Sequence, residues 1–407
     1  MSSARAEINQ RLSAGLSRGT NQSGVRLYNE RLVLSLIRRH GELPKADIAR
    51  MTRLSPQTIS IIMNQLEADG LLRRGNAVRG RVGQPSVPYS LDPDGAFFLG
   101  LKIGRRSSDV VLLDFLGRVL SRIHEPHPCP TPQSTIALAR RGVSELAGAL
   151  PERQRRRVAG FGIASPFELW NWQSQFAAPP DVLDAWRHAD IRADVAAVSP
   201  WPVYLHNDGT AACSAELVLG QSAHGPDFLY IFIGSFIGGG VVLNGHLFPG
   251  RTGYSGAIGP LPVRAADGGF QQILRSTSIY VLADKLKLAG IDPKVLWTDP
   301  DDWGDLGAPL AEWVADAAQD IAQAIVSALS IIEFGSIVID GAFPRSVRAT
   351  LVAAIRAAVA QFDLQGLPPI NVVEGTMGSG AREIGGACLP LLANFTQDRE
   401  VLFKENG

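Results

Sequence analysis

Apolar and polar positions follow a helical period in a short segment near the N-terminus. Four apolar residues recur at i, i+3, i+4 and i+7, namely Ile59, Ile62, Met63 and Leu66. This spacing predicts a helix with one buried face. Ser55 is a favoured N-cap residue, Pro56 suits the first helical position, and Gly70 provides a natural stop.

The opposite face of this helix is polar. Hydrogen-bonding side chains suited to base edges and phosphates in a major groove lie at Gln57, Thr58, Ser60 and Asn64. A short helix from Lys45 to Met51 and a turn at Thr52–Leu54 come before it, and a longer helix from Arg26 to Arg39 comes first. The arrangement is typical of a helix-turn-helix, with Lys45 and Ser55 as further DNA contacts.

The segment after Gly70 predicts a hairpin. Leu71–Arg74 and Ser86–Leu91 are strand-like, and the Gly-rich stretch between them carries Arg79 and Arg81. At the tip of such a wing, both arginines can reach a minor groove or a phosphate.

Charge distinguishes DNA binding from the alternative of an ordinary three-helix module, which would show the same apolar spacing. Residues 1–90 contain 14 Lys and Arg against 6 Asp and Glu, a net charge of +8, whereas the 407-residue chain is neutral overall. The remainder therefore carries −8. A basic head on an acidic body favours double-stranded DNA as a partner.

Beyond residue 92 the pattern changes to alternating strands and helices. Two hairpins are predicted, at Phe97–Ile103 with Asp109–Asp114 and at Phe228–Gly234 with Gly239–Asn244. Further strands and helices follow each hairpin, including a long helix at Ala308–Phe334. The repetition predicts two α/β lobes with a cleft between them.

Composition excludes several classes of protein. The apolar fraction of 45% and charged fraction of 19% are typical of a globular chain. The most apolar stretch, Phe228–Leu243, is interrupted by glycines and is too short for a membrane helix. The N-terminus is too polar for a signal peptide, and the three cysteines lack zinc-site spacing. We expect a cytoplasmic protein that does not contact a membrane.

Several motifs resemble the ROK family of transcriptional regulators. The N-terminal part carries D-I-A-R-M-T-R-L-S-P-Q-T-I-S at Asp47–Ser60 and G-R-V-G-Q-P at Gly80–Pro85. The body carries matching motifs at His206–Glu216, Tyr230–Gly245 and Ile337–Gly341. The resemblance implies an α/β, actin-like (ribonuclease-H-like) two-lobed ROK domain preceded by an α+β winged helix-turn-helix domain.

The implied domain boundaries follow from these motifs. We expect a flexible tail at residues 1–24, the winged domain at residues 25–91 and the ROK domain at residues 92–407. One lobe is expected at roughly residues 92–206 with the C-terminal helix, and the other at residues 207–377.

The chain departs from the motifs of ROK kinases. In place of D-x-G-G-T, Lys102–Arg106 is K-I-G-R-R, so a lysine replaces the metal-binding aspartate and arginines occupy the phosphate turn. Phe236 replaces a glycine of the second phosphate turn. The sugar-binding G-E-I-G-H is G-A-I-G-P at Gly256–Pro260, and the family's zinc cysteines are missing at residues 265–274. We therefore expect no enzyme activity, no cofactor and no metal.

A ligand site is still implied by the resemblance. Asp208 matches the base of ROK kinases, and with Asn207 it can accept hydrogen bonds from a sugar, although either residue can instead cap the following helix. Trp172 and Gln271 are further candidate contacts, with core packing as the alternative for Trp172.

The sequence thus predicts a repressor of carbohydrate-related genes that binds an operator and senses a sugar or sugar derivative, as a homodimer or homotetramer. Two alternatives are an active sugar kinase with a DNA-binding head and a regulator that senses a partner protein.

Overall fold

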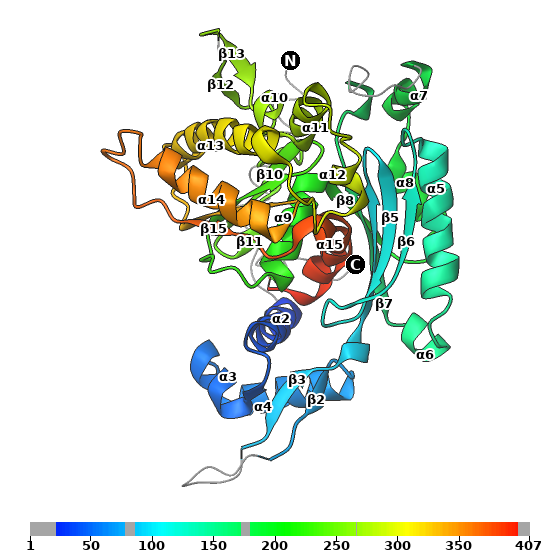
Figure 1. The fold of residues 1–407 in the computed structure, drawn as a ribbon. Coiled ribbons are helices and arrows are strands. Elements are labelled where there is room, and N and C mark those ends of the chain that lie inside the picture. Colours follow the sequence, from blue (N-terminus) through cyan, green and yellow to red (C-terminus); the bar gives the residue numbers. More distant parts are fainter. Residues whose placement is uncertain (1–21, 78–85, 172–179, 266, 398–407) are drawn as a thin grey trace, which may run out of the picture. The chain divides into compact units, whose positions relative to one another are not determined.

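The computed structural model describes residues 22–77, 86–171, 180–265 and 267–397. The chain forms two compact units (Figure 1). Among the described residues, the first comprises those from Gln22 to Ala96 together with Leu392–Gln397, and the second comprises those between Phe97 and Leu391. The chain therefore leaves the first unit after its N-terminal part and returns to it at its C-terminal end.

The first unit is a small α+β domain. Its elements are α2 (Gln22–His40), β1 (Leu43–Pro44), α3 (Lys45–Thr52), α4 (Pro56–Ala68), β2 (Leu72–Arg74) and β3 (Pro88–Leu91). The strands form an antiparallel sheet in the order β1-β3-β2. The predicted helix-turn-helix and flanking strands are present, and α2 begins at Gln22, before the predicted start at Arg26.

Local sequence explains the tight connection between α3 and α4. Arg53 ends α3 with a left-handed backbone (φ 58°). Ser55 then caps α4, since its Oγ accepts a hydrogen bond from the Thr58 backbone N at 3.1 Å. The four predicted core residues are all buried: Ile59, Ile62, Met63 and Leu66. Helix α4 therefore places its apolar face in the core of the unit, as predicted.

The C-terminal end of the chain is held in the first unit by α2. The Gln397 backbone N donates to Ser35 Oγ at 3.3 Å, and the Gln397 side-chain Nε2 is hydrogen-bonded to the Tyr28 hydroxyl. Helix α15 (Ala381–Phe395) thus begins in the second unit and ends in the first. The sequence predicts that residues up to 407 belong to the ROK domain, whereas the described residues from Leu392 onward group with the first unit.

The second unit contains two five-stranded sheets of the same topology. The first has the order β6-β5-β4-β7-β8, from β4 (Phe97–Ile103), β5 (Ser107–Leu113), β6 (Val119–Pro126), β7 (Val158–Ser165) and β8 (Val203–Asn207). The second has the order β11-β10-β9-β14-β15, from β9 (Phe228–Ile233), β10 (Ile237–Leu243), β11 (His246–Leu247), β14 (Ser336–Gly341) and β15 (Val372–Glu374).

In each sheet an antiparallel three-stranded meander is joined to two parallel strands. This repetition confirms the two predicted α/β lobes. A separate two-stranded sheet is formed by β12 (Pro262–Arg264) and β13 (Phe270–Gln272).

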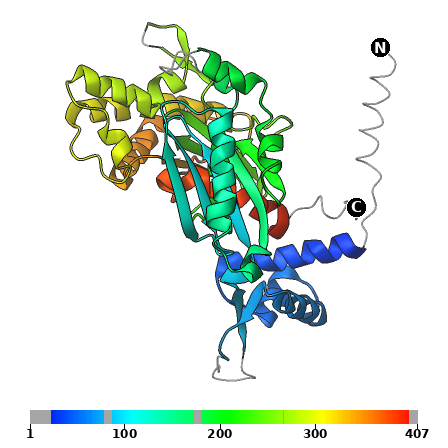
Figure 2. The same cartoon turned by 90° about the vertical axis from the view of Figure 1, so that its right-hand side faces the viewer.

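Helices cover these sheets. They are α5 (Pro132–Arg141), α6 (Glu152–Arg155), α7 (Pro180–Asp184), α8 (Ile191–Ala196), α9 (Asp208–Leu219), α10 (Leu274–Thr277), α11 (Ile279–Leu288), α12 (Val295–Thr298), α13 (Gly307–Leu329), α14 (Arg345–Val359) and α15. Helix α5 lies over one face of the first sheet, and α15 lies against the other face (Figures 1 and 2).

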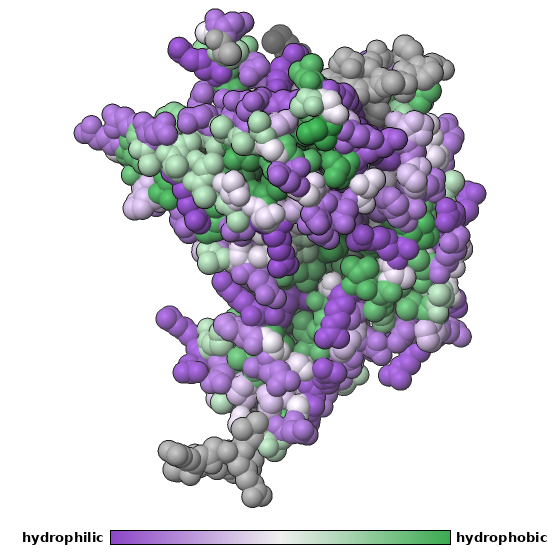
Figure 3. All heavy atoms as spheres, in the orientation of Figure 1, coloured by the Kyte–Doolittle hydropathy of each residue, from purple (hydrophilic) through white to green (hydrophobic). Residues whose placement is uncertain are grey.

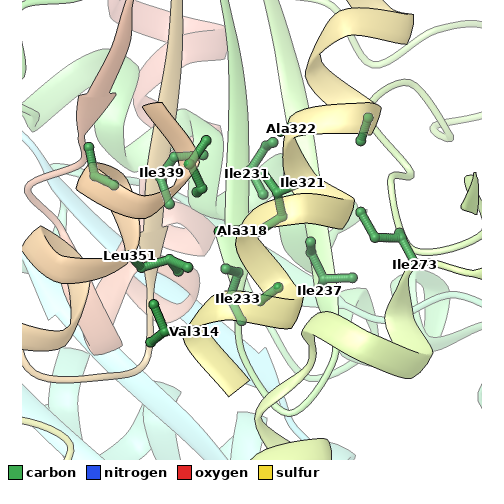
Figure 4. Close-up of a cluster of buried hydrophobic side chains, with 14 of the residues drawn as sticks. Ile231, Ile233, Ile237, Ile273, Val314, Ala318, Ile321, Ala322, Ile339 and Leu351 are labelled. Carbon is green, nitrogen blue, oxygen red and sulfur yellow. The ribbon is translucent and has the colours of Figure 1, made fainter. Parts of the chain in front are cut away.

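Helix α13 supplies much of the core of the second lobe. Its side chains Ala318 and Ile321 belong to one buried cluster with Ile231 and Ile233 of β9 and Leu351 of α14 (Figure 4). This Ala- and Ile-rich helix is therefore a core element of the second lobe.

The predicted C-terminal end of this helix was wrong. Helix α13 ends at Leu329 instead of Phe334. Ser330 is the C-cap residue, and both its backbone N–H and its hydroxyl donate to the Val326 carbonyl, at 3.2 and 2.9 Å. The chain then has only a short segment in which to reverse into β14.

On the face shown in Figure 3, hydrophobic residues reach the surface in small patches among hydrophilic ones. In the described parts of the chain, no helix combines the length and the apolar character needed to cross a bilayer.

Helices α9 and α15 cross in backbone contact. A Cβ atom placed on Gly385 of α15 would lie 1.8 Å from the Ala211 carbonyl oxygen of α9. Helix α15 also contacts the first sheet closely, since a Cβ on Gly162 of β7 would lie 1.9 Å from the Gly386 carbonyl oxygen. Glycine is therefore required at the crossing for steric reasons.

We predict that Gly385→Ala destabilises the second unit, because the two helices must move apart to admit the new methyl group. Overpacking of this kind costs about 1–3 kcal/mol. The Tm of unfolding, followed by circular dichroism, should fall by several degrees. Gly225→Ala is the matched control, because a Cβ there meets nothing within 4 Å. Equal Tm values for the two variants would contradict the close crossing.

Candidate functional site

The exposed face of α4 is the first candidate site. Gln57 and Asn64 are exposed, and Thr58 and Ser60 are half-buried. Ser55 caps the helix, and its hydroxyl is also 2.8 Å from the Thr58 hydroxyl. Both hydroxyls therefore support the helix start, while the two amide side chains are available to a ligand.

Lys45 is tied to this face. Its Nζ donates to Asn64 Oδ1 at 2.7 Å and lies 5.4 Å from the ring centroid of Tyr89 on β3. Burial lowers the pKa of Lys45, and repulsion by Arg74 adds to the effect while Glu67 opposes it. The hydrogen bond between Lys45 and Asn64 joins α3 to α4 and fixes the orientation of the Asn64 amide.

Ile61 is a surface residue that the apolar pattern of the sequence did not reveal. Its exposed fraction is 61%, whereas Ile59 and Ile62 on the same helix are 0% and 5% exposed. Ile61 lies four residues after Gln57 and three before Asn64, so it shares their face. The spacing of Ile61 from Gln57 and Asn64 indicates this exposed face in the sequence. The run of three apolar residues at 61–63 suggests burial instead.

The wing lies only partly within the described residues. Arg79 and Arg81 fall outside them. The adjoining strands bear two exposed arginines. Arg74 pairs with Glu67 at 2.7 Å, and the Nε of Arg73 donates to Ser90 Oγ at 3.2 Å.

The position that holds a metal-binding aspartate in family kinases forms a buried ion pair here. Lys102 Nζ is 2.5 Å from Asp109 Oδ2, and these residues face each other across β4 and β5. His124 Nδ1 is 2.6 Å from the other Asp109 oxygen. Burial raises the pKa of Asp109, but attraction to Lys102 and hydrogen bonds from Lys102 and His124 outweigh it and leave the pKa below its usual value.

The two arginines of the β4–β5 turn contact aromatic rings on the other lobe. The Cζ of Arg105 lies 5.0 Å from the ring centroid of Phe236, and that of Arg106 lies 4.2 Å from the Trp297 ring on α12. Burial lowers the pKa of Arg105 to about 10, and the charge of Arg106 contributes to the shift. These cation–aromatic contacts tie the β4–β5 turn to the second lobe.

The predicted pair Asn207 and Asp208 lies at the start of α9. Asn207 Oδ1 caps the helix by accepting from Gly209 N at 3.0 Å, and Asp208 Oδ1 accepts from the same N–H. Asp208 Oδ2 faces Arg382 of α15, whose Nη1 is 3.5 Å away. The capping alternative therefore holds for Asn207, and Asp208 gains a partner that was not predicted.

Arg382 has features of a ligand contact. Its side chain is 15% exposed and lies over the Phe232 ring, with Cζ 5.3 Å from the centroid. Among the described residues, its buried Nε has no hydrogen-bond partner. A sequence separation of more than 170 residues from Asp208 explains why no local pattern revealed it.

The other predicted ligand contacts stay untested. Trp172 lies outside the described residues. Gln271 is half-buried on β13, opposite Val263 on the small separate sheet. The neighbouring Trp170 is partly buried against the first core, and Arg187 lies 5.5 Å from its ring centroid.

A bridge between two loops was also not predicted. Glu168 has a left-handed backbone (φ 54°) and follows β7. Its carboxylate accepts hydrogen bonds from the Tyr254 hydroxyl at 3.1 Å and from Asn171 Nδ2 at 2.7 Å. Phe167 packs edge-on against Tyr254 with centroids 5.1 Å apart. The bridge joins segments from the two lobes.

The segment at the position of the family's zinc cluster does not fit a zinc ion. Residues 265–274 contain neither Cys nor His, so thiolate and imidazole ligands are missing.

Two protein families match this chain. Residues 98–390 match the ROK family, and residues 28–81 match the MarR family. An uncharacterized protein of Sinorhizobium fredii is 24% identical over 380 residues, covering 90% of this chain and 91% of that protein. The xylose repressor of Bacillus subtilis is 22% identical over 243 residues, covering 60% of this chain and 62% of the repressor. The latter match spans less than two thirds of the repressor.

Solved structures show the same fold. A ROK family transcriptional regulator described as a homologue of the E. coli MLC protein has a TM-score of 0.64 at 19% identity, covering 93% of this chain and 99% of that one. A ROK family glucokinase from Streptomyces griseus has a TM-score of 0.54 at 19% identity, covering 72% and 99%. Since the ROK match spans most of the chain, the protein belongs to the ROK family, with a MarR-like winged helix-turn-helix unit before its two-lobed ROK domain.

Proposed function

We propose that this protein is a sequence-specific transcription regulator that binds operator DNA through α4 and the wing. The observation that carries the proposal is the polar face of α4, with Gln57 and Asn64 exposed and Asn64 oriented by Lys45. An α-helix of this kind fits the major groove, where amide side chains discriminate base pairs. The net charge of +8 over residues 1–90 supplies the attraction to phosphates.

The proposed regulatory role is repression of carbohydrate-related genes. Support comes from relatives named xylose repressor and transcriptional regulator. A homodimer or homotetramer would present two heads to two half-sites, and half-site spacing on DNA is geometrically strict. A ligand that changes the spacing of the heads would therefore release the operator.

The ROK unit is proposed to sense a ligand without transferring phosphate. Phosphoryl transfer requires space for the phosphates and a carboxylate that helps to hold magnesium. Here Lys102 stands at the carboxylate position and is neutralised by Asp109. Arg105 and Phe236 pack together where both phosphate turns of a kinase stay open.

The proposed ligand is a sugar or sugar derivative bound beside Asp208 and Arg382. Sugar hydroxyls both donate and accept hydrogen bonds, and the pair offers a carboxylate acceptor and a guanidinium donor. The guanidinium of Arg382 lies over the Phe232 ring, which holds its donors beside Asp208.

DNA binding is tested by replacing both wing arginines. Arg79→Ala/Arg81→Ala should weaken operator affinity and lower the slope of log K against log salt by about 1–2, because phosphate contacts release counterions. Fluorescence anisotropy at several salt concentrations measures both. Arg153→Ala/Arg155→Ala removes two exposed arginines from the second unit and is the control. An unchanged slope in the wing variant would refute the wing assignment.

If the ligand binds beside Asp208, the Asp208→Ala variant should no longer respond to sugar, either in its Tm or in its operator affinity. Pentoses and hexoses that bind should raise the Tm of the wild-type protein. In the variant this shift and the effect of the sugar on operator affinity should disappear, with operator affinity in the absence of sugar retained. Asp301→Ala, at an exposed aspartate, is the control. If the variant responds as the wild type does, the site lies elsewhere; if no sugar shifts the wild type, a partner protein becomes the favoured signal.

The second candidate function, a sugar kinase, is favoured only by the retained Asp208 and by kinases of the same fold. We expect no sugar-dependent ADP release in a coupled assay with MgATP and a panel of sugars. A ROK glucokinase assayed in parallel is the positive control. Turnover above the rate without protein would overturn the proposed loss of kinase activity.

A further inference from the structure

An apolar side chain stands at the centre of the exposed face of α4. Ile61 is 61% exposed, although the adjacent Ile62 is 5% exposed in the core of the same unit. Its neighbours on that face are the exposed amides of Gln57 and Asn64. A single apolar residue between two amides is not a contiguous apolar patch of the kind that docks proteins.

The hydrogen bond of Lys45 restricts what Asn64 can recognise. The Asn64 carbonyl oxygen accepts from Lys45 Nζ at 2.7 Å, which leaves the NH₂ group as the free end of the amide. The usual bidentate contact of asparagine with adenine needs both ends. In this arrangement Asn64 and Lys45 both offer donors, which match acceptors such as guanine O6 and N7 or thymine O4.

Base pairs differ in apolar groups as well as in hydrogen-bonding groups. In the major groove the C5-methyl group of thymine is the apolar feature of the unmodified bases. An isoleucine on the groove-facing side of a recognition helix can bury that methyl group, whereas it offers nothing to a guanine edge.

We infer that Ile61 is a specificity-determining residue that contacts the C5-methyl group of a thymine in each half-site, beside a donor contact from Asn64. The inference rests on the proposed DNA-binding function and deepens it. The recognised half-site therefore contains a thymine whose methyl group, independently of its hydrogen bonds, contributes to affinity.

The test separates the methyl group from the rest of the base. The full-length protein first selects binding sites from a random duplex library. In the selected site each thymine is then replaced, one at a time, by deoxyuridine, which lacks only the methyl group. The dissociation constants of wild type and Ile61→Ala are measured at one salt concentration by fluorescence anisotropy.

For the wild type we expect one thymine per half-site at which uracil weakens binding about three- to fivefold, as the loss of one buried methyl group predicts. Ile61→Ala should lose this discrimination and keep the salt dependence of the wild type. Met51→Ala is the matched control, because Met51 is an exposed apolar residue (42%) on α3. It should discriminate as the wild type does. Equal Tm values would show that all three proteins are folded.

Two results would overturn the inference: a wild type that binds every uracil-containing site as tightly as the parent site, or an Ile61→Ala variant that still discriminates. A selection that enriches no sequence would instead refute sequence-specific DNA binding itself. The failure of the inference and the failure of the proposed function are thus distinguishable.

Discussion

The backbone contact between α9 and α15 is the constraint on which the ROK unit depends. Gly385 has no side chain, so the Ala211 carbonyl can approach it, and Ser214 Oγ donates to both the Ala211 and Gly385 carbonyls at 2.7 and 3.0 Å. The same helix α15 packs against the first sheet, while α9 contacts β10 of the second. The crossing thereby sets the distance between Asp208 and Arg382, because both lie in the first turns of the crossing helices.

A second set of contacts holds the start of α15. The buried Asp340 accepts hydrogen bonds from Tyr230, from Arg348 at 2.7 Å, and from backbone N–H groups at Met377 and Gly378. These bonds hold the short 3₁₀ turn (Gly378–Gly380) that leads into α15. The paired or stacked side chains of the β4–β5 turn and the polar pair Asp208–Arg382 lie on different elements, so each can be arranged independently of the other.

The sequence predicted those features that local patterns determine. The period of the apolar residues gave the buried face of α4, and repeated hairpins gave the two lobes, both of which the fold confirms. Features that depend on tertiary contacts were missed. Arg382 reaches Asp208 only through the helix crossing, and the bridge of Glu168 to Tyr254 needs two loops from different lobes. Ile61 was missed for another reason. Its spacing from Gln57 and Asn64 places it on the exposed face of the helix, but its apolar side chain suggested that it is buried in the core. The roles of Arg79, Arg81 and Trp172 remain predictions.

The ion pair between Lys102 and Asp109 limits which substitutions the β4–β5 hairpin can accept. The two residues face each other across neighbouring strands, with side chains 9% and 3% exposed. An acidic residue at position 102 would set two buried carboxylates side by side, and loss of Asp109 alone would leave a buried ammonium group without a partner carboxylate. Breaking a buried pair costs about 3–5 kcal/mol, a large part of the stability of a typical domain. The two positions are therefore coupled, so that a substitution at one is tolerated only together with a compensating substitution at the other.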